Sequence, residues 1–93
     1  MIMSFATQET ELIFRGCVVE GLSPRLQDLA LLKLQVLAAA VELRDLEAMP
    51  SNRFELLRGE REGYHCIAVY DLARICFLWE GGHAHKVEIF GYQ

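Results

Sequence analysis

The sequence predicts an α+β fold, with an N-terminal strand and two helices packed on one face of a mainly antiparallel sheet of three to five strands. Two observations lead to this prediction. The first is that apolar residues recur with the period of a helix between residues 24 and 40. The second is that they recur with the period of a strand from residue 54 onward. The chain has 93 residues, the length of one domain, so we expect residues 1–93 to form a single unit.

The first elements are expected to be a short strand and a helix. Residues 2–5 are short, apolar and compatible with a β-strand. Thr7 is suited to cap a helix that follows it, and Glu9 and Glu11 favour that helix because carboxylates stabilise the positive end of the helix dipole. The apolar side of this helix would consist of Leu12, Ile13 and Phe14, with Gly16 and Gly21 after it.

A long helix is expected to begin at Ser23 and Pro24 and to run to about Ala40, because serine is a preferred N-cap and proline a preferred first helical residue. One apolar stripe comprises Leu26, Ala30, Leu34, Leu37 and Val41, and a neighbouring stripe comprises Leu29, Leu32, Val36 and Ala40. Together the stripes are wider than one sheet face needs. Two interpretations stay open: the helix is deeply buried, or Leu29, Leu32 and Val36 bind a partner protein or a second copy of the chain.

The remainder of the chain predicts short strands joined by tight turns. Residues 41–48 have room for a further helical turn, which the segment around Pro50 would end. Strands are expected at residues 54–57, 64–70, 74–80 and 84–90, with hairpin turns at residues 71–73 and 80–82. The side chains expected to face the core are Ile67, Val69, Ile75, Phe77, Trp79, Val87 and Ile89.

The charge distribution limits the surfaces available for nucleic acid. The net charge is −4, whereas a protein that binds nucleic acid over a broad face usually presents an excess of lysine and arginine to the phosphates. Residues 51–93 are nearly neutral, with five basic and six acidic side chains. A local basic cleft is therefore compatible with the second half of the chain, and a broad basic face is not.

Cysteine usage and hydropathy indicate a cytoplasmic protein without a metal or cofactor. Cys17, Cys66 and Cys76 are odd in number and lack CxxC spacing, so we expect reduced thiols, with Cys66 and Cys76 in apolar strands. His83 and His85 would share one strand face, but no third ligand is evident. No apolar run reaches the roughly 18 residues that a membrane span needs. The N-terminus also lacks the features of a signal peptide, so no membrane partner is expected.

A series of short motifs runs through the chain in a fixed order. The motifs are sparse at residues 2–5, 9–11, 23–24 and 43–46, and dense in Pro50-Ser51-Asn52-Arg53, Leu57-Arg58-Gly59, Arg61, Gly63, Arg74-Ile75-Cys76-Phe77, Trp79-Glu80 and Val87-Glu88-Ile89 with Tyr92. In this order and spacing the chain resembles the HigB branch of the RelE/ParE toxin superfamily, also called plasmid maintenance system killer proteins. The resemblance implies the toxin of a type II toxin–antitoxin pair, which enters the ribosomal A site, cuts mRNA, and is held inactive by a helix-turn-helix, HigA-like antitoxin.

The resemblance also implies the residues of the site. Arg58 and Arg74 match basic positions of the family's active cleft, and Tyr92 matches a tyrosine near the family's C-terminus, so these three are the catalytic candidates. Metal-independent RNA cleavage requires stabilisation of the phosphorane charge, for which the arginine fork is suited. Contacts to RNA are expected from Arg53, Arg58, Arg61 and His65, the last as an additional base inferred from its position alone.

Several family positions differ in this chain. Ala68 replaces a usual arginine, Ala73 a usual tryptophan, and the usual ending Asp-Tyr-His reads Gly91-Tyr92-Gln93. The positions of the long helix that carry several basic side chains in the family read Asp28, Leu29, Leu32 and Gln35. The alternative function is therefore a catalytically inactive, toxin-derived protein that binds an antitoxin or itself. A third hypothesis, ParE-like inhibition of DNA gyrase, ranks last because the loop motifs are of the HigB type.

The same residues are also compatible with purely structural roles. Arg53, Arg58 and Arg61 alternate with Glu55, Glu60 and Glu62, a pattern typical of an exposed face of paired charges. Arg74 at the start of a strand is equally compatible with a structural ion pair, and Tyr92 with packing at the edge of the sheet.

Overall fold

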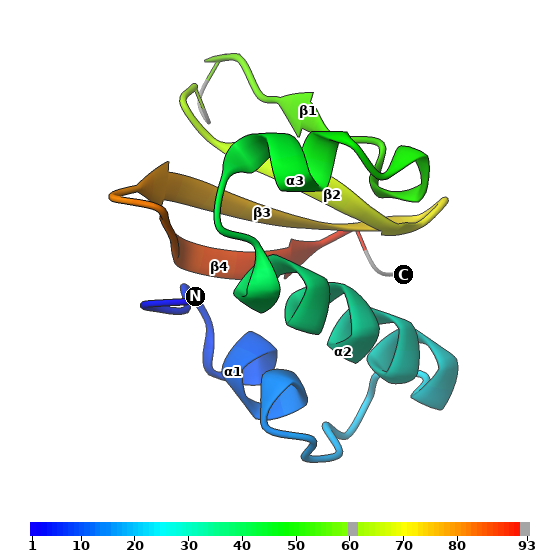
Figure 1. The fold of residues 1–93 in the computed structure, drawn as a ribbon. Helices are drawn as coiled ribbons and strands as arrows, with labels where there is room; N and C mark the ends of the chain where they lie inside the picture. The colour runs from blue at the N-terminus through cyan, green and yellow to red at the C-terminus, as the bar shows by residue number, and fades with distance from the viewer. Residues whose placement is uncertain (60–61, 92–93) are drawn as a thin grey trace.

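The computed structural model describes residues 1–59 and 62–91 and confirms the α+β class. Within this part of the chain, three α-helices and one 3-10 helix precede or flank a four-stranded antiparallel sheet (Figure 1). The elements are α1 (Gln8–Phe14), α2 (Pro24–Ala39), α3 (Leu43–Glu47), η1 (Pro50–Asn52), β1 (Glu55–Leu56), β2 (His65–Tyr70), β3 (Ala73–Glu80) and β4 (His83–Phe90). The strands are ordered β1-β2-β3-β4, so each pairs with its neighbour in sequence.

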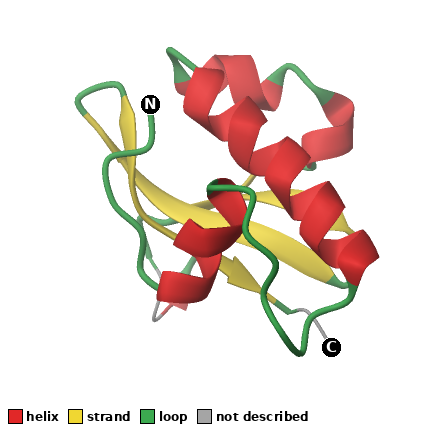
Figure 2. Cartoon of the chain, turned by 90° about the horizontal axis from the view of Figure 1, so that it is seen from below, coloured by secondary structure: helices red, strands yellow, loops and turns green. Residues whose placement is uncertain are grey.

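The helices α1 and α2 cover the same face of the sheet (Figure 2). The core between these layers contains Ile67, Ile75, Phe77 and Val87, all fully buried. Because side chains alternate along a strand, the intervening residues of β2 and β3 point to the opposite face. No α-helix among the described residues packs over that opposite face, and it carries the candidate site.

The N-terminal segment is not the regular strand that we expected. It lies beside β4 and forms only two isolated parallel bridges, Ile2 with Ala84 and Phe5 with Val87. Lys86 lies between the two bridged positions of β4 and has a left-handed backbone with φ of 52°. Its amide donates to the Ser4 hydroxyl at 2.9 Å instead of to a main-chain carbonyl. This local break in the edge of β4 prevents a continuous ladder.

The long helix begins where the sequence predicts and ends one residue before the expected limit. The Ser23 hydroxyl accepts a hydrogen bond from the Leu26 amide at 3.0 Å, and Pro24 occupies the first turn. Helix α2 ends at Ala39, which puts Val41 outside it and leaves that side chain 74% exposed. Val41 therefore does not continue the apolar stripe of the helix, whereas the other members Leu26, Ala30, Leu34 and Leu37 are buried.

Two buried polar side chains tie the helices to the loops around them. Gln27 accepts a hydrogen bond from the Val19 amide and donates to the carbonyls of Val19 and Leu22, each at 2.8 Å. Asn52 is completely buried and donates to the Leu46 carbonyl at 2.9 Å. These two amides replace main-chain hydrogen bonds that the irregular segments cannot make themselves.

No helix in the part of the chain that is described has the length and apolar character to cross a bilayer.

Candidate functional site

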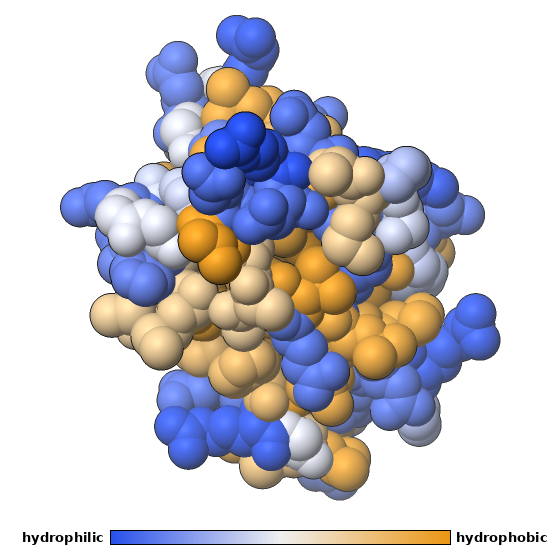
Figure 3. Space-filling view, viewed as in Figure 1, coloured by the Kyte–Doolittle hydropathy of each residue, from blue (hydrophilic) through white to orange (hydrophobic). Residues whose placement is uncertain are grey.

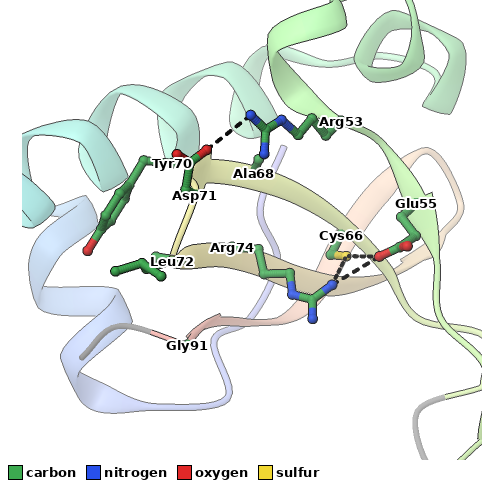
Figure 4. A pocket seen from close by; sticks show the side chains of 10 residues that line it. Arg53, Glu55, Cys66, Ala68, Tyr70, Asp71, Leu72, Arg74 and Gly91 are labelled. Atoms are coloured by element: carbon green, nitrogen blue, oxygen red, sulfur yellow. Dashed lines mark hydrogen bonds and ion pairs between the residues drawn. The ribbon is translucent and has the colours of Figure 1, made fainter.

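The open face of the sheet holds a pocket of about 400 Å³ at the end where β2 turns into β3 (Figure 4). Arginine, carboxylate and apolar side chains all contribute to its lining. The lining residues are Arg53, Glu55, Cys66, Ala68, Tyr70, Asp71, Leu72, Ala73, Arg74 and Gly91. The lining thus comes from the loop before β1, from β1 itself, from the β2–β3 hairpin and from the residue that follows β4.

A β-bulge in the β2–β3 hairpin sets which side chains meet in the pocket. The hairpin closes with Tyr70 opposite Ala73, and regular pairing from there would place Cys66 opposite Phe77. The register shifts between Ala68 and Tyr70, so Ala68 lies opposite Arg74 and Cys66 opposite Cys76. The bulge therefore brings Arg74 and Cys66 onto the same face, next to each other.

Both arginines of the pocket are paired with carboxylates from distant parts of the chain. Arg74 donates to Glu55 at 3.0 Å, and Arg53 donates to Asp71 at 3.1 Å (Figure 4). All four side chains remain more than half exposed. Ion pairs in this environment contribute only about 0–1 kcal/mol, so a phosphate group could displace the carboxylates at small cost. The arrangement is suited to binding an anion between two guanidinium groups.

The thiol of Cys66 completes the surroundings of Arg74. Its sulfur lies 3.9 Å from Nη1 of Arg74 and 3.7 Å from Oε1 of Glu55. A hydrogen bond with Cys76 lowers the pKa of the Cys66 thiol, and the guanidinium of Arg74 lowers it further, against the opposing effects of burial and of Glu55. In return, the hydrogen bond with Cys66 raises the pKa of Arg74, which stays protonated.

The structure brings together only some of the residues predicted for the site. Arg53 and Arg74 share the pocket, whereas Arg58 is exposed just beyond β1 and does not line it. Arg61 and Tyr92 lie outside the described residues. One interpretation of the sequence grouped Glu55 with the nearby Arg53, Arg58 and Arg61, but in the structure Glu55 pairs with Arg74, 19 positions along the chain. Glu55, Cys66 and Asp71 were missed as site residues, because only the strand register reveals their proximity to the arginines.

His65 lies apart from the pocket. Its ring stacks on Phe54 with centroids 5.4 Å apart and contacts Phe77 at 5.9 Å, on the side of the sheet that faces the core. Its Nδ1 atom is buried without a hydrogen-bond partner among the described residues. Burial lowers the pKa of His65 below its ordinary value of 6.5. A contact of His65 with RNA stays a prediction.

The stability of the fold is expected to fall in mild acid because of His65. The unfolded residue binds a proton more readily than the folded one, so this contribution is fully present above pH 6.5 and is lost as the pH falls below that value. His65→Phe keeps a ring between Phe54 and Phe77 and removes the titration. Urea unfolding at pH 7.5 and 5.5 should show a larger loss for the wild type than for the variant. Equal losses would contradict a neutral, buried imidazole.

Gly91 closes the pocket at the end of β4 and has no room for a side chain. Its φ is 77°, and a Cβ atom would lie 2.7 Å from the carbonyl oxygen of Leu72. Both features require glycine. An aspartate, which the resembled family usually has at this position, would therefore clash with the β2–β3 turn. The backbone geometry of this chain explains why Gly91 stands there.

Gly91→Asp is accordingly expected to destabilise the protein and not to supply an acid. Left-handed strain contributes about 1–2 kcal/mol and the contact with the Leu72 backbone adds to it, so we expect a loss of roughly 2 kcal/mol or more. Gly59→Asp is a matched control, because Gly59 also has positive φ but a Cβ atom added there would meet no described atom within 4 Å. Chemical denaturation of both variants would measure the difference. Equal destabilisation would exclude the Leu72 contact as the cause.

The predicted partner-binding residues lie on the exposed side of α2. Leu32 is 59% exposed, whereas Leu29 and Val36 are half-buried and pack partly against the core. Val36 also borders a shallow hollow of about 290 Å³ between α2 and α3, together with Leu46 and Met49. Apolar surface gathers in the middle of this face of the molecule (Figure 3). The face is compatible with the expected partner, whose binding remains untested.

The described residues contain no group of three or more histidine, cysteine or acidic side chains placed to hold a metal ion.

Comparison with known proteins links the chain to a toxin. It is 42% identical over 52 residues to Toxin HigB-1 of Vibrio cholerae serotype O1. The matched segment is 56% of this chain and 55% of that toxin, so the chain spans about half the length of the curated relative it matches. No family model matches the chain. The similarity supports the HigB-like resemblance seen in the sequence.

Proposed function

We propose that this protein is the toxin of a type II toxin–antitoxin system and that it has a RelE-like fold, acts in the cytoplasm and cleaves mRNA on the ribosome. The similarity to Toxin HigB-1 is the observation that carries the proposal. The pocket supports it, because Arg53 and Arg74 approach one cavity from different elements on the uncovered face of the sheet.

In this proposal Arg74 stabilises the charge that develops on the scissile phosphate. Arg53 holds a neighbouring phosphate, and each guanidinium exchanges its carboxylate partner for a phosphate oxygen when RNA binds. Arg58, Arg61 and Tyr92 are assigned to RNA contact and proton transfer on the strength of the sequence resemblance. The reaction uses no metal ion or cofactor.

The inhibitory partner is proposed to be a helix-turn-helix antitoxin of the HigA type. It would cover the apolar side chains Leu29, Leu32 and Val36 on α2, of which Leu32 is the most exposed to a partner. A homodimer through the same face is the alternative assembly.

Expression of the chain in cells without an antitoxin tests the proposal. We expect growth arrest, relief by the neighbouring helix-turn-helix protein, and new 5′ ends in ribosome-bound mRNA by primer extension. Arrest without new mRNA ends would exclude the ribonuclease assignment but would still indicate a toxin. Supercoiling by DNA gyrase would then be measured as the alternative target. Normal growth with intact mRNA would exclude both the toxin and the ribonuclease assignments.

A second candidate is a toxin-derived binding protein without catalysis. It is favoured by the geometry at Gly91, which admits no acid, and by Ala68, which leaves a methyl group opposite Arg74 where the family usually has arginine. It predicts a tight complex with the antitoxin and no mRNA cleavage. A monomer by light scattering that fails to retain the neighbouring helix-turn-helix protein would rule it out.

A further inference from the structure

Two cysteines face each other across neighbouring strands beside the pocket. Cys66 of β2 and Cys76 of β3 are direct partners in the antiparallel register. Directly opposed residues in antiparallel strands have Cα atoms about 4.5 or 5.5 Å apart, and both separations lie inside the range of about 4.4–6.8 Å that a disulfide spans. The Cα separation expected for the pair therefore fits a disulfide.

The surroundings of this pair differ from those of a thiol in a hydrophobic core. Both residues are almost completely buried, but neither belongs to the core cluster between sheet and helices. Cys66 is 2% exposed but is one of the residues that line the pocket, so a small molecule would approach it from the pocket. Its sulfur contacts the guanidinium of Arg74 at 3.9 Å, and a cation at this distance stabilises a thiolate. Glu55, at 3.7 Å, opposes that effect and accepts the thiol proton as a hydrogen bond.

We propose that Cys66 and Cys76 form a redox-active dithiol, which peroxides oxidise to an intramolecular disulfide at the wall of the Arg74 pocket. The inference rests on the strand register, the contact with Arg74 and the access through the pocket, and it does not depend on the proposed function. A reducing compartment would hold the pair reduced, and an oxidant converts it.

The reaction takes place in two steps. The Cys66 thiolate attacks one peroxide oxygen, the O–O bond breaks, and Cys66 becomes a sulfenic acid while the leaving oxygen takes up a proton. The Cys76 sulfur then attacks the Cys66 sulfur, the S–O bond breaks, and the departing hydroxide leaves as water with the Cys76 proton. Two electrons pass from the dithiol to the peroxide. With hydrogen peroxide, the products are one disulfide and two molecules of water.

Oxidation changes the pocket at a defined point. The disulfide removes the proton that Cys66 donates to Glu55, and it removes the ionisable sulfur from beside Arg74. Glu55 then loses the hydrogen bond from the thiol, and Arg74 loses a neighbour that can carry a negative charge.

The experiment uses the full chain with Cys17→Ala, which removes the exposed third cysteine. The reduced protein is treated with hydrogen peroxide, quenched with catalase, and alkylated in denaturant. We expect intact mass spectrometry to show the loss of two hydrogen atoms, no alkylation, and recovery of two alkylation sites after dithiothreitol. Peptide mapping should find Cys66 linked to Cys76 within one chain.

Two controls separate the native pair from nonspecific oxidation. In the same background, Cys76→Ser should change the mass shift caused by peroxide from the loss of two hydrogen atoms to the addition of oxygen. Circular dichroism would confirm that this variant is folded. If that variant does not fold, the Cys17→Ala protein oxidised in urea serves instead, and it should form the disulfide more slowly than the native protein. Unreacted thiols in the native protein, sulfinic acids without a disulfide, or faster linkage in urea would each overturn the proposal.

Discussion

Asn52→Leu is expected to lower the free energy of unfolding by roughly 2–4 kcal/mol, the largest stability effect that we expect of a single substitution here. Asn52 is completely buried, and its Oδ1 atom accepts a hydrogen bond from Nζ of Lys33 at 2.6 Å while its amide donates to the Leu46 carbonyl. Leucine fills a similar volume but leaves the buried carbonyl and the ammonium without this partner. Partial burial lowers the pKa of Lys33 from its ordinary value.

Ser51→Ala provides the matched control for this prediction. Ser51 is exposed, and its hydroxyl accepts from the same Lys33 ammonium at 3.1 Å. Loss of this exposed hydrogen bond should change stability by less than about 1 kcal/mol. Urea denaturation of both variants at neutral pH would make the comparison. If both substitutions have the same small effect, Asn52 does not anchor η1 and α3 to α2.

Arg74→Ala is expected to reduce mRNA cleavage by about 100-fold or more, provided that the proposed activity is present. Arg74 projects into the pocket from the start of β3, and its fork can exchange Glu55 for two phosphate oxygens. Arg74→Lys keeps the charge and loses the fork, so an intermediate rate is expected. Glu55→Gln removes the competing carboxylate and should raise the rate or the affinity for RNA.

Arg15→Ala is the control for the loss of a cation. Arg15 forms an exposed ion pair with Glu11 at 2.8 Å on α1, and its removal changes the net charge by the same amount as Arg74→Ala. Single-turnover cleavage of ribosome-bound mRNA would be measured for all variants, with circular dichroism as the folding check. Equal rates for Arg15→Ala and Arg74→Ala would remove Arg74 from the catalytic assignment while leaving the toxin assignment open.

The candidate site could be predicted only in part. Arg53 and Arg74 were identified from the motif order, and both face the pocket. Arg58 was identified in the same way but lies outside the lining, because β1 ends before it and the chain turns away. His65 was taken as a base that contacts RNA. Whether it contacts RNA remains untested, but the alternation of β2 turns its ring toward Phe54 and Phe77, away from the arginines.

The sequence by itself determined the type and order of the main elements. Ser23 and Pro24 start α2, the change of apolar period after Pro50 marks the sheet, and Gly81 and Gly82 turn β3 into β4, as predicted. These signals act over a few residues, since caps, turns and side-chain periodicity depend on local backbone geometry. Even the short helix α3 occupies the segment expected to hold one further turn.

Only the tertiary structure decided which side chains meet. The bulge between Ala68 and Tyr70 moves the strand register by one residue, and this shift puts Cys66 opposite Cys76 and Ala68 opposite Arg74. It was also the folded chain that paired Arg74 with Glu55 and set Gly91 against the Leu72 carbonyl. The physical reason is that strand register and close backbone approach depend on contacts between distant segments. The conformational preferences of residues within one short segment carry no information about those contacts.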